Sequence, residues 1–410
     1  MARALSKYLA GHAEEEAKLR PRLARRYRFV VCIPACDEED TLLETLRNLA
    51  STEQAQNALA IVVLNASAGA PERVHAANAR CAQALRSAAQ LGSSCRALGS
   101  LSGLDLLLID RAEPGRTLPP KQGVGLARKI GADVALAWIA DGSVETPLIW
   151  STDADVVVPP DYFTRPLHAS LDASAFVFPF THRLEGDASQ RAAMRSYDQY
   201  LRYYLDGLRR AGSPYAFHTI GSTLCIGATA YAQVRGFPKR QAGEDFYLLN
   251  KLAKVGSIVT LTGQPIELSG RTSDRVPFGT GAAVRQIQAQ RAQGSAYTVE
   301  NPLVFDALGA WLELLDHAAH EDAFEALEDR LEALEAPYAQ PLRRALGAAG
   351  HLAAARAAFE QCHGTVLRKR LHDWNDAFRT LKLIHQLRDE GLDEVPADEV
   401  FAPDHSIPTG

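Results

Sequence analysis

Residues 148–160 read Leu-Ile-Trp-Ser-Thr-Asp-Ala-Asp-Val-Val-Val-Pro-Pro, so the acidic pair Asp153 and Asp155 directly follows a short apolar run. Such a run is typical of a buried strand. Side chains two residues apart in an extended segment point the same way, so these carboxylates can share one hard cation, Mg²⁺ or Mn²⁺. In open α/β sheets, ligands bind at the carboxyl ends of strands. Taken alone, an Asp-x-Asp pair is equally typical of a solvated loop or turn.

The composition is that of an ordinary globular protein. The chain has 410 residues, of which 47% are hydrophobic and 23% charged, enough for two domains or one large domain with a helical appendage. The formal charge of −5 argues against a nucleic-acid partner. No apolar run reaches the length of a membrane-spanning helix, and residues 1–28 lack the apolar core of a signal peptide.

The N-terminal segment carries five arginines between positions 20 and 28. This cluster leaves open a peripheral contact with anionic lipid, although the acids at 14–16 favour a solvated helix face. The six cysteines form no Cys-x-x-Cys pair and the 12 histidines no His-Glu-x-x-His motif, so a zinc site is not expected. Scattered thiols in a chain of this size indicate a reducing compartment, and we expect a cytoplasmic protein.

Strands and helices alternate through the first half of the chain. The apolar pattern predicts helices over 1–26, 41–49, 72–91 and 188–210, and strands over 29–33, 59–64, 104–109, 148–152, 175–180 and 255–261. We expect the strand at 29–33 to be stopped by Pro34. The alternation implies a parallel sheet in a βαβ arrangement. From about residue 302, leucines recur at helical spacing, which predicts an all-helical region over 300–395 and a loose tail over 396–410.

Four separated segments carry the charged residues that matter for chemistry. They are Ile33-Pro34-Ala35-Cys36-Asp37-Glu38-Glu39, the Asp153/Asp155 pair, Gly243-Glu244-Asp245 at a predicted helix start, and the loop Arg271-Thr272-Ser273-Asp274-Arg275. Acids in the first three and cations in the fourth suit a metal-bound diphosphate with a carboxylate base nearby.

The order Pro-Ala-x-Asp-Glu-Glu, Asp-x-Asp, Gly-Glu-Asp resembles the family 2 glycosyltransferases, and the resemblance covers about residues 27–285. It implies the GT-A fold, a Rossmann-like nucleotide-sugar fold whose mostly parallel sheet is flanked by helices. It also implies inverting transfer of a hexosyl group from a nucleoside-diphosphate sugar to an acceptor hydroxyl. All three motifs, in this order, are far more specific than any one alone.

The resemblance assigns roles to the motif residues. The first motif is expected to lie against base and ribose through Pro34, Ala35, Asp37 and Glu38. Asp153 and Asp155 correspond to the pair that binds the cation bridging the diphosphate, either Mg²⁺ or Mn²⁺, and Asp153 also lies against the donor. Glu244 and Asp245 correspond to the catalytic acids, and Asp245 is favoured as the base. Acids at this point are also simply typical of a helix's first turn.

The chain departs from the family pattern in two places. The second strand ends Leu64-Asn65-Ala66-Ser67, where many members have Asp-Asp-Gly-Ser. Asn65 offers an amide that both donates and accepts, so the nucleobase is not specified. The Gln-x-x-Arg-Trp motif and membrane helices of the processive members are missing from the sequence, which indicates a soluble enzyme that adds a single sugar.

Several further residues have two interpretations. Lys121, Gly123 and Arg128 lie in a Gly-rich segment resembling the family's stretch beside the donor, but such cations are equally typical of a helix surface. Arg271 and Arg275 either stabilise charge on the leaving diphosphate or face solvent. His218 either lines the acceptor pocket or is structural. The helical region either shapes the acceptor pocket or forms a subunit contact, and the oligomeric state is not specified.

Two rival functions stay open at this point. A nucleotidyltransferase of related fold needs a Gly-rich, basic loop straight after the first strand, where this chain has Pro34-Ala35-Cys36-Asp37-Glu38. A non-catalytic nucleotide-sugar-binding scaffold would have no need of all four acids at 153, 155, 244 and 245. The sequence names neither the sugar nor the acceptor.

Overall fold

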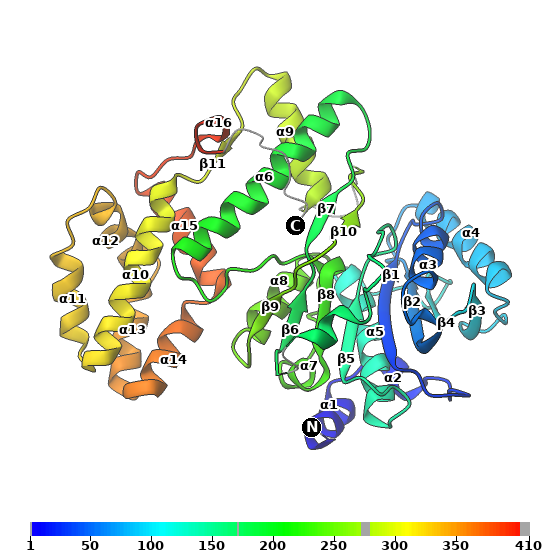
Figure 1. Cartoon of the computed structure of the whole chain (residues 1–410). Coiled ribbons are helices and arrows are strands. Elements are labelled where there is room, and N and C mark those ends of the chain that lie inside the picture. The colour runs from blue at the N-terminus through cyan, green and yellow to red at the C-terminus, as the bar shows by residue number, and fades with distance from the viewer. Residues whose placement is uncertain (1, 170–171, 272–278, 402–410) are drawn as a thin grey trace. The chain divides into compact units, whose positions relative to one another are not determined.

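The computed structural model describes residues 2–169, 172–271 and 279–401 (Figure 1). The chain divides into two compact units. The first comprises Met1–Gly186 and Thr219–Ala282, and the second Asp187–His218 and Ala283–Gly410. Among the described residues, no helix combines the length and apolarity needed to cross a membrane.

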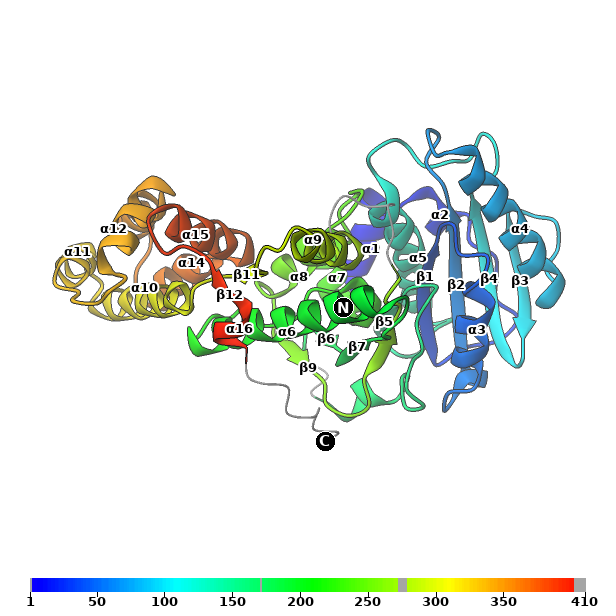
Figure 2. The same ribbon diagram turned by 90° about the horizontal axis from the view of Figure 1, so that it is seen from above.

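The first unit is built on an eight-stranded sheet with the order β3-β4-β2-β1-β5-β8-β6-β9. Figure 2 shows β1, β2, β4 and β3 following one another across one half of it. β4, β2, β1 and β5 are mutually parallel, whereas β3 and β8 run antiparallel to their neighbours. The strands are β1 (Phe29–Ala35), β2 (Ala58–Asn65), β3 (Arg96–Leu101), β4 (Leu104–Arg111), β5 (Leu148–Ser151), β6 (Ala175–Val177), β8 (Leu224–Gly227) and β9 (Ile258–Thr260). The predicted fold class, a mostly parallel α/β sheet with a helical C-terminal region, is confirmed.

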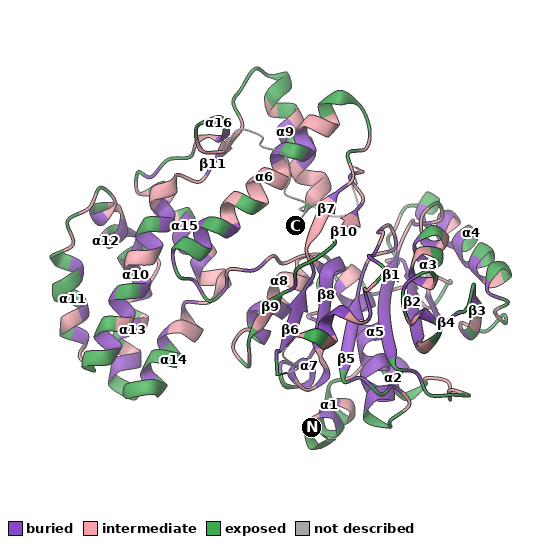
Figure 3. Cartoon of the chain, viewed as in Figure 1, coloured by how far each residue is buried: buried purple, intermediate pink, exposed green. Residues whose placement is uncertain are grey.

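Helices cover both faces of this sheet, which explains its continuous apolar strands. Phe29, Val31 and Ile33 of β1 share a core with α3 (Leu42–Ala50) and α4 (Glu72–Ala88). Cys32, on the opposite face, meets α5 (Gly123–Ala140) at Gly131. α5 is buried along nearly its whole length, as Figure 3 shows.

A buried polar cluster attaches the N-terminal helix α1 (Ala2–Gly11) to the sheet's covering helices. Asp133 of α5 accepts hydrogen bonds from Tyr8 Oη at 2.6 Å, Tyr231 Oη at 2.9 Å and Lys129 Nζ at 2.9 Å. Tyr231 belongs to α7 (Ala228–Gln233), so three helices meet at one carboxylate. The remaining elements of this unit are α2 (Glu15–Lys18), α8 (Glu244–Leu252), β7 (Phe180–His182) and β10 (Ile266–Leu268), the last two forming a separate parallel pair.

The structure differs from the sequence-based prediction at several points. Residues 1–26 are helical only over α1 and α2. β1 does not stop at Pro34 but continues through it, and Pro34 pairs in register with Val63 of β2. On its other side, β1 pairs with β5 only at Val31 and Cys32. Because β5 does not pair with β1 at Pro34, the missing N–H of the proline is tolerated. The predicted strand over 175–180 is two short strands, β6 and β7, in different sheets.

The edge strand β3 was not predicted. It forms a hairpin with β4 through Ser102 and Gly103, both of which have positive φ, at 52° and 89°. A two-residue turn of this kind is the common hairpin connection. The Ser-Gly pair was therefore the signal available in the sequence.

The second unit is helical. Its elements are α6 (Ala188–Arg210), most of α9 (Thr280–Ala292), α10 (Pro302–Glu321), α11 (Phe324–Glu332), α12 (Ala339–Ala348), α13 (His351–Gln361), α14 (Gly364–Trp374), α15 (Ala377–Asp389), α16 (Ala397–Val400), and the paired strands β11 (Thr298–Val299) and β12 (Val395–Pro396). Leu308, Leu312 and Leu315 are buried in its core, as their spacing predicts. Tyr203 and Tyr204 of α6 pack against Phe305 of α10, so α6 belongs to this core.

Candidate active site

The sheet topology gathers the predicted motif residues of the first unit at one edge. β1 and β5 are parallel neighbours, so their carboxyl ends lie at the same edge. From β1 the chain continues to β2 and β4 on one side and later returns to β5 on the other. This reversal is a topological switch point, where ligands bind in open α/β sheets. The first motif follows β1, and the Asp153/Asp155 pair follows β5.

The first motif is held in place by its own neighbours. Pro34 and Ala35 end β1. Asp37 has a left-handed backbone, with φ of 59°; its N–H donates to Asn78 Oδ1 at 2.9 Å, and its carboxylate pairs with Arg73 at 2.8 Å. Glu38 is nearly buried and accepts a hydrogen bond from Thr41 Oγ1 at 2.7 Å.

Asn65, at the end of β2, uses its amide nitrogen inside the protein. Nδ2 donates to the carbonyl oxygens of Ala35 at 2.9 Å and Val63 at 3.2 Å. The backbone carbonyl of Asn65 in turn accepts a hydrogen bond from Asn78 Nδ2 at 2.9 Å. Asn65 therefore ties the ends of β1 and β2 together, a role the sequence did not reveal, and Asn78 is a supporting residue that the sequence analysis missed.

Arg128 is the centre of the most buried part of the site. Its side chain is 4% exposed, and it donates to Glu244 Oε1 at 2.8 Å and to Asp153 Oδ1 at 2.5 Å. It also donates to Ser151 Oγ at 2.9 Å and the Thr152 carbonyl at 3.3 Å. Burial lowers the pKa of Arg128, but the carboxylates of Asp153 and Glu244 outweigh it and hold that pKa above its ordinary range. The guanidinium thus stays charged and binds protein carboxylates while almost fully buried, which differs from the helix-surface interpretation.

Three glycines allow this arrangement. A Cβ on Gly221, just before β8, would lie 2.6 Å from Arg128 Nη2. A Cβ on Gly125 would lie 2.5 Å from the Pro238 carbonyl, and one on Gly123 would lie 3.1 Å from Gln241 Cα. The first turn of α5 therefore packs directly on the segment that leads into α8, and this packing brings Arg128 to Glu244. Lys121 lies just before α5, with φ of 66°.

Glu244 and Asp245 begin α8, and the two carboxylates differ in burial and in their charged partners. The Glu244 side chain is 5% exposed and paired with Arg128. Asp245 is half-buried. Burial, and then the charge of Glu244, raise the pKa of Asp245 to about 7, against the opposing effects of Arg128 and of the Phe246 and Gly221 backbone. A carboxylate with a pKa near 7 can accept a proton at neutral pH.

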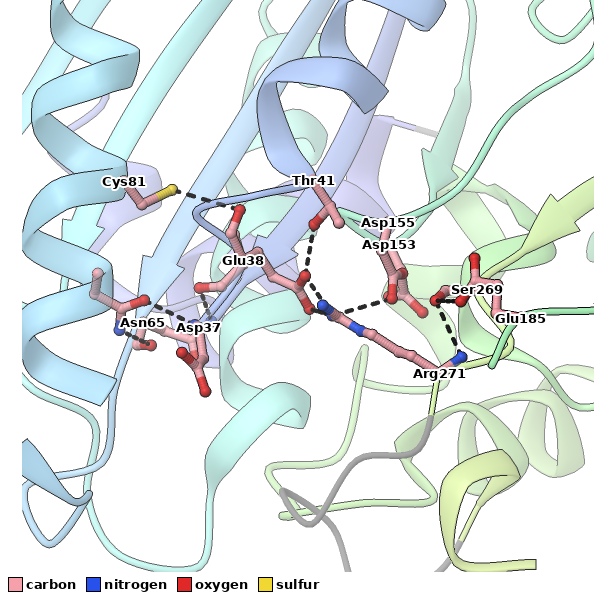
Figure 4. Close-up of polar contacts among 12 residues, drawn as sticks. Asp37, Glu38, Thr41, Asn65, Cys81, Asp153, Asp155, Glu185, Ser269 and Arg271 are labelled. Atoms are coloured by element: carbon pink, nitrogen blue, oxygen red, sulfur yellow. Dashed lines mark hydrogen bonds and ion pairs between the residues drawn. The ribbon is translucent and has the colours of Figure 1, made fainter. Parts of the chain in front are cut away.

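Arg271 links the two strand ends on the opposite side of the site. Its guanidinium contacts both carboxylate oxygens of Glu38 and lies 3.1 Å from Asp155 Oδ2 (Figure 4). Arg183 donates to the Asp155 carbonyl at 3.1 Å and to Glu185 at 2.9 Å. Arg183 and Glu185 were not predicted, because neither belongs to a recognisable motif.

The described residues of the first unit do not include two of the predicted site residues. Arg275 lies outside the described residues. His218 belongs to the second unit, where burial, followed by Arg209 and Arg202, lowers its pKa to about 4.

The Asp153/Asp155 pair fits part of a magnesium or manganese ligand set. Both offer hard oxygen atoms, and the Asp153 side chain remains 39% exposed beyond its contact with Arg128. Within the described residues, no three His, Cys, Asp or Glu side chains cluster in a way that could hold a metal ion. The described residues alone therefore supply an incomplete set, which phosphate oxygens or water can complete.

Comparison with known proteins finds similarity at the level of structure. No protein-family model and no curated protein sequence matches the chain. S. aureus TarS (residues 1–349), solved with UDP-GlcNAc, is 13% identical with a TM-score of 0.41, covering 86% of this chain and 91% of TarS. Glucosyl-3-phosphoglycerate synthase from Mycobacterium tuberculosis, solved with Mn²⁺, UDP and glucosyl-3-phosphoglycerate, is 15% identical with a TM-score of 0.36, covering 73% and 88%. The mannosyltransferase PcManGT from Pyrobaculum calidifontis, solved with GDP-Man and Mn²⁺, is 18% identical with a TM-score of 0.37, covering 92% and 94%.

Proposed function

We propose that this chain is an inverting, metal-dependent glycosyltransferase that moves a hexosyl group from a nucleoside-diphosphate sugar to an acceptor hydroxyl. One observation carries the proposal: Arg128 contacts both Asp153 and Glu244. The Asp-x-Asp and Glu-Asp motifs, far apart in the sequence, therefore belong to a single site. The described residues that carry the function lie in the first unit, within the predicted catalytic region over 27–285.

The donor half of the proposed site lies at the carboxyl ends of β1 and β5. Base and ribose would lie along the β1 end, near Asp37 and Glu38, and the diphosphate would lie beside Asp153 and Asp155. A divalent cation bound by that pair would neutralise charge on the diphosphate as it departs. Arg271 supplies a further positive charge on the same side of the site.

The acceptor half is organised by Asp245. In the proposed step, the acceptor hydroxyl gives its proton to the Asp245 carboxylate while its oxygen forms a bond to the anomeric carbon. The bond from that carbon to the diphosphate oxygen breaks, and the nucleoside diphosphate leaves with the electron pair. Attack from the face opposite the leaving group inverts the configuration through an oxocarbenium-like transition state.

The thiols support a cytoplasmic location for the proposed enzyme. All six cysteines are free, and three of them are buried. Free thiols are typical of proteins in reducing compartments, which supports the cytoplasm.

A panel of nucleoside diphosphates and nucleotide sugars, each with and without Mn²⁺, tests the proposal by thermal unfolding. A ligand that binds only the folded state raises the melting temperature. We expect a metal-dependent rise for one nucleobase, lost in Asp153→Ala and retained in a control, Asp172→Asn, at an exposed acid before β6. The identified donor is then assayed for transfer, with product stereochemistry read by NMR.

Three results would overturn this function. No shift with any donor would remove the donor-site assignment. Release of pyrophosphate from a nucleoside triphosphate and a sugar phosphate would instead identify a nucleotidyltransferase. Donor binding without turnover in both wild type and Asp245→Asn would indicate a non-catalytic scaffold.

A further inference from the structure

Arg271 occupies the place between the two strand ends that the donor would use. It follows β10, and its backbone N–H donates to Ser269 Oγ at 3.3 Å. Ser269 in turn donates to Glu185 Oε2 at 3.2 Å. Figure 4 shows the guanidinium pointing between Glu38, from the end of β1, and Asp155, from the end of β5. One cation therefore contacts a carboxylate beyond the end of each of these two strands.

The three partners differ in how firmly they are held. The Glu38 side chain is 6% exposed and fixed by Thr41, and the Asp155 side chain is 17% exposed. The Arg271 side chain is 32% exposed and stands on a flexible stem. The two carboxylates are thus the more buried members of the group, and the more exposed cation is the member that can leave.

A divalent cation at Asp155 and the guanidinium of Arg271 compete for the same negative charge. Two cations at one carboxylate repel each other, and the repulsion is strong in a partly buried site. Displacing Arg271 from Asp155 without a replacement anion takes away one of its carboxylate contacts. A bound diphosphate would supply that replacement, because guanidinium groups bind phosphate oxygens well.

We propose that Arg271 is the resident counter-cation of the donor-free site, which makes binding of a divalent cation at Asp155 conditional on a nucleoside diphosphate. This inference rests on the proposed function and adds to it a way in which metal binding is regulated. Metal alone binds weakly because it must displace Arg271. Metal and diphosphate bind with positive coupling because the diphosphate takes over the guanidinium, and the same coupling must act in both directions.

Mn²⁺ titrations of the full-length chain, followed by water-proton relaxation enhancement, test this directly. They are run with Mn²⁺ alone and with UDP or GDP present, on wild type, Arg271→Ala and the control Arg47→Ala, which removes an equal charge from an exposed position of α3. In Arg271→Ala we expect Mn²⁺ alone to bind about fivefold tighter or more, the lower end of typical coupling between linked ligands. The coupling between Mn²⁺ and nucleotide should fall by a similar factor, and Arg47→Ala should behave as wild type.

Asp155→Asn separates failure of this inference from failure of the proposed function. If Asp155→Asn abolishes Mn²⁺ binding while Arg271→Ala leaves the affinity for Mn²⁺ alone unchanged or weaker, the counter-cation role is overturned and the metal site stands. If Asp155→Asn and Asp153→Asn both leave Mn²⁺ binding unchanged, the proposed metal site itself is overturned. Arg271→Lys keeps the charge but loses the planar fork, so its affinity for Mn²⁺ alone should lie between those of wild type and Arg271→Ala.

Discussion

The guanidinium of Arg128 donates to the carboxylate of Glu244 at 2.8 Å, and both side chains are almost completely buried, with 4% and 5% of their surface exposed. α5 and α8 are thereby joined by a charged contact inside the protein. The same guanidinium holds Asp153 on its other side. One arginine therefore links Asp153 of the proposed metal pair to Glu244, the chain neighbour of the proposed base Asp245.

Removing this arginine should destabilise the first unit strongly. Arg128→Met leaves Glu244 as a buried carboxylate without its counter-charge, and breaking a buried pair in this way costs about 3–5 kcal/mol. Urea unfolding of Arg128→Met, Glu244→Gln and the double variant measures the loss and the coupling. We expect the double variant to be less destabilised than the sum of the single variants. Additive losses would show that the two side chains do not interact, and the exposed Arg47→Met serves as the neutral control.

A single methyl group at Gly221 should disturb the same contact. The Cβ of Gly221→Ala would lie 2.6 Å from Arg128 Nη2, and that guanidinium is already fixed by Ser151, Asp153 and Glu244. Overpacking of this kind costs about 1–3 kcal/mol. Thermal unfolding should show the loss, together with reduced glycosyl transfer.

Gly92→Ala is the matched control, because an added Cβ there meets no atom within 4 Å. If Gly221→Ala were as stable and active as Gly92→Ala, the close packing of Gly221 on Arg128 would not matter for the site.

The pH dependence of the reaction should report Asp245. A base must be deprotonated to act, and the pKa of Asp245 is raised to about 7, so kcat/KM should rise with pH and level off above that value. Asp245→Asn should lose both the activity and this limb of the profile. A profile that is already level at pH 5 would assign the proton transfer to another group.

The contribution of Asp245 to the stability of the folded protein should fall as pH rises, whereas the activity should rise. Asp245 has a folded-state pKa above its ordinary value of 3.8, so the unfolded chain loses its proton at lower pH than the native chain. Stability from this group is therefore fully present below about pH 4 and falls as pH rises to about 7. Asp245→Asn should remove that fall, so the variant should unfold at a higher temperature than wild type at pH 8. A variant less stable than wild type at pH 8 would contradict the buried, destabilised carboxylate.

Replacing Asn65 with aspartate should destabilise the protein, although many members of the family that the chain resembles carry aspartate at the end of the second strand. Asn65 Nδ2 donates to the carbonyl oxygens of Ala35 and Val63, and a carboxylate cannot donate to either. Asn65→Asp should lower the free energy of unfolding by about 1–3 kcal/mol, the usual cost of an unsatisfied buried polar group. Urea unfolding at pH 7 measures it. An unchanged midpoint would mean that this amide is not needed to join β1 to β2.

Local sequence patterns were enough to predict the central strands and the order of the motifs. β1, β2, β4 and β5 are mostly apolar and almost entirely buried, as expected for strands covered on both faces. β3 was missed, because an edge strand of mixed polarity gives no clear alternation. The assignment of α6 to the helical unit also could not be predicted, since an apolar stripe specifies a buried face and not the partner that covers it.

The sequence by itself determined which residues are proposed to carry the chemistry: the acids after the strand ends and at the start of α8, in an order that resembles a known family. Only the tertiary structure decided how they are paired. Arg128 and Glu244 are 116 positions apart, and Arg271 and Glu38 are 233 positions apart. Helical and strand periodicities act over a few residues, whereas such charge pairs form only where the sheet brings distant strand ends to one edge. The fold therefore turned two apparently ordinary arginines into the cations that organise the site.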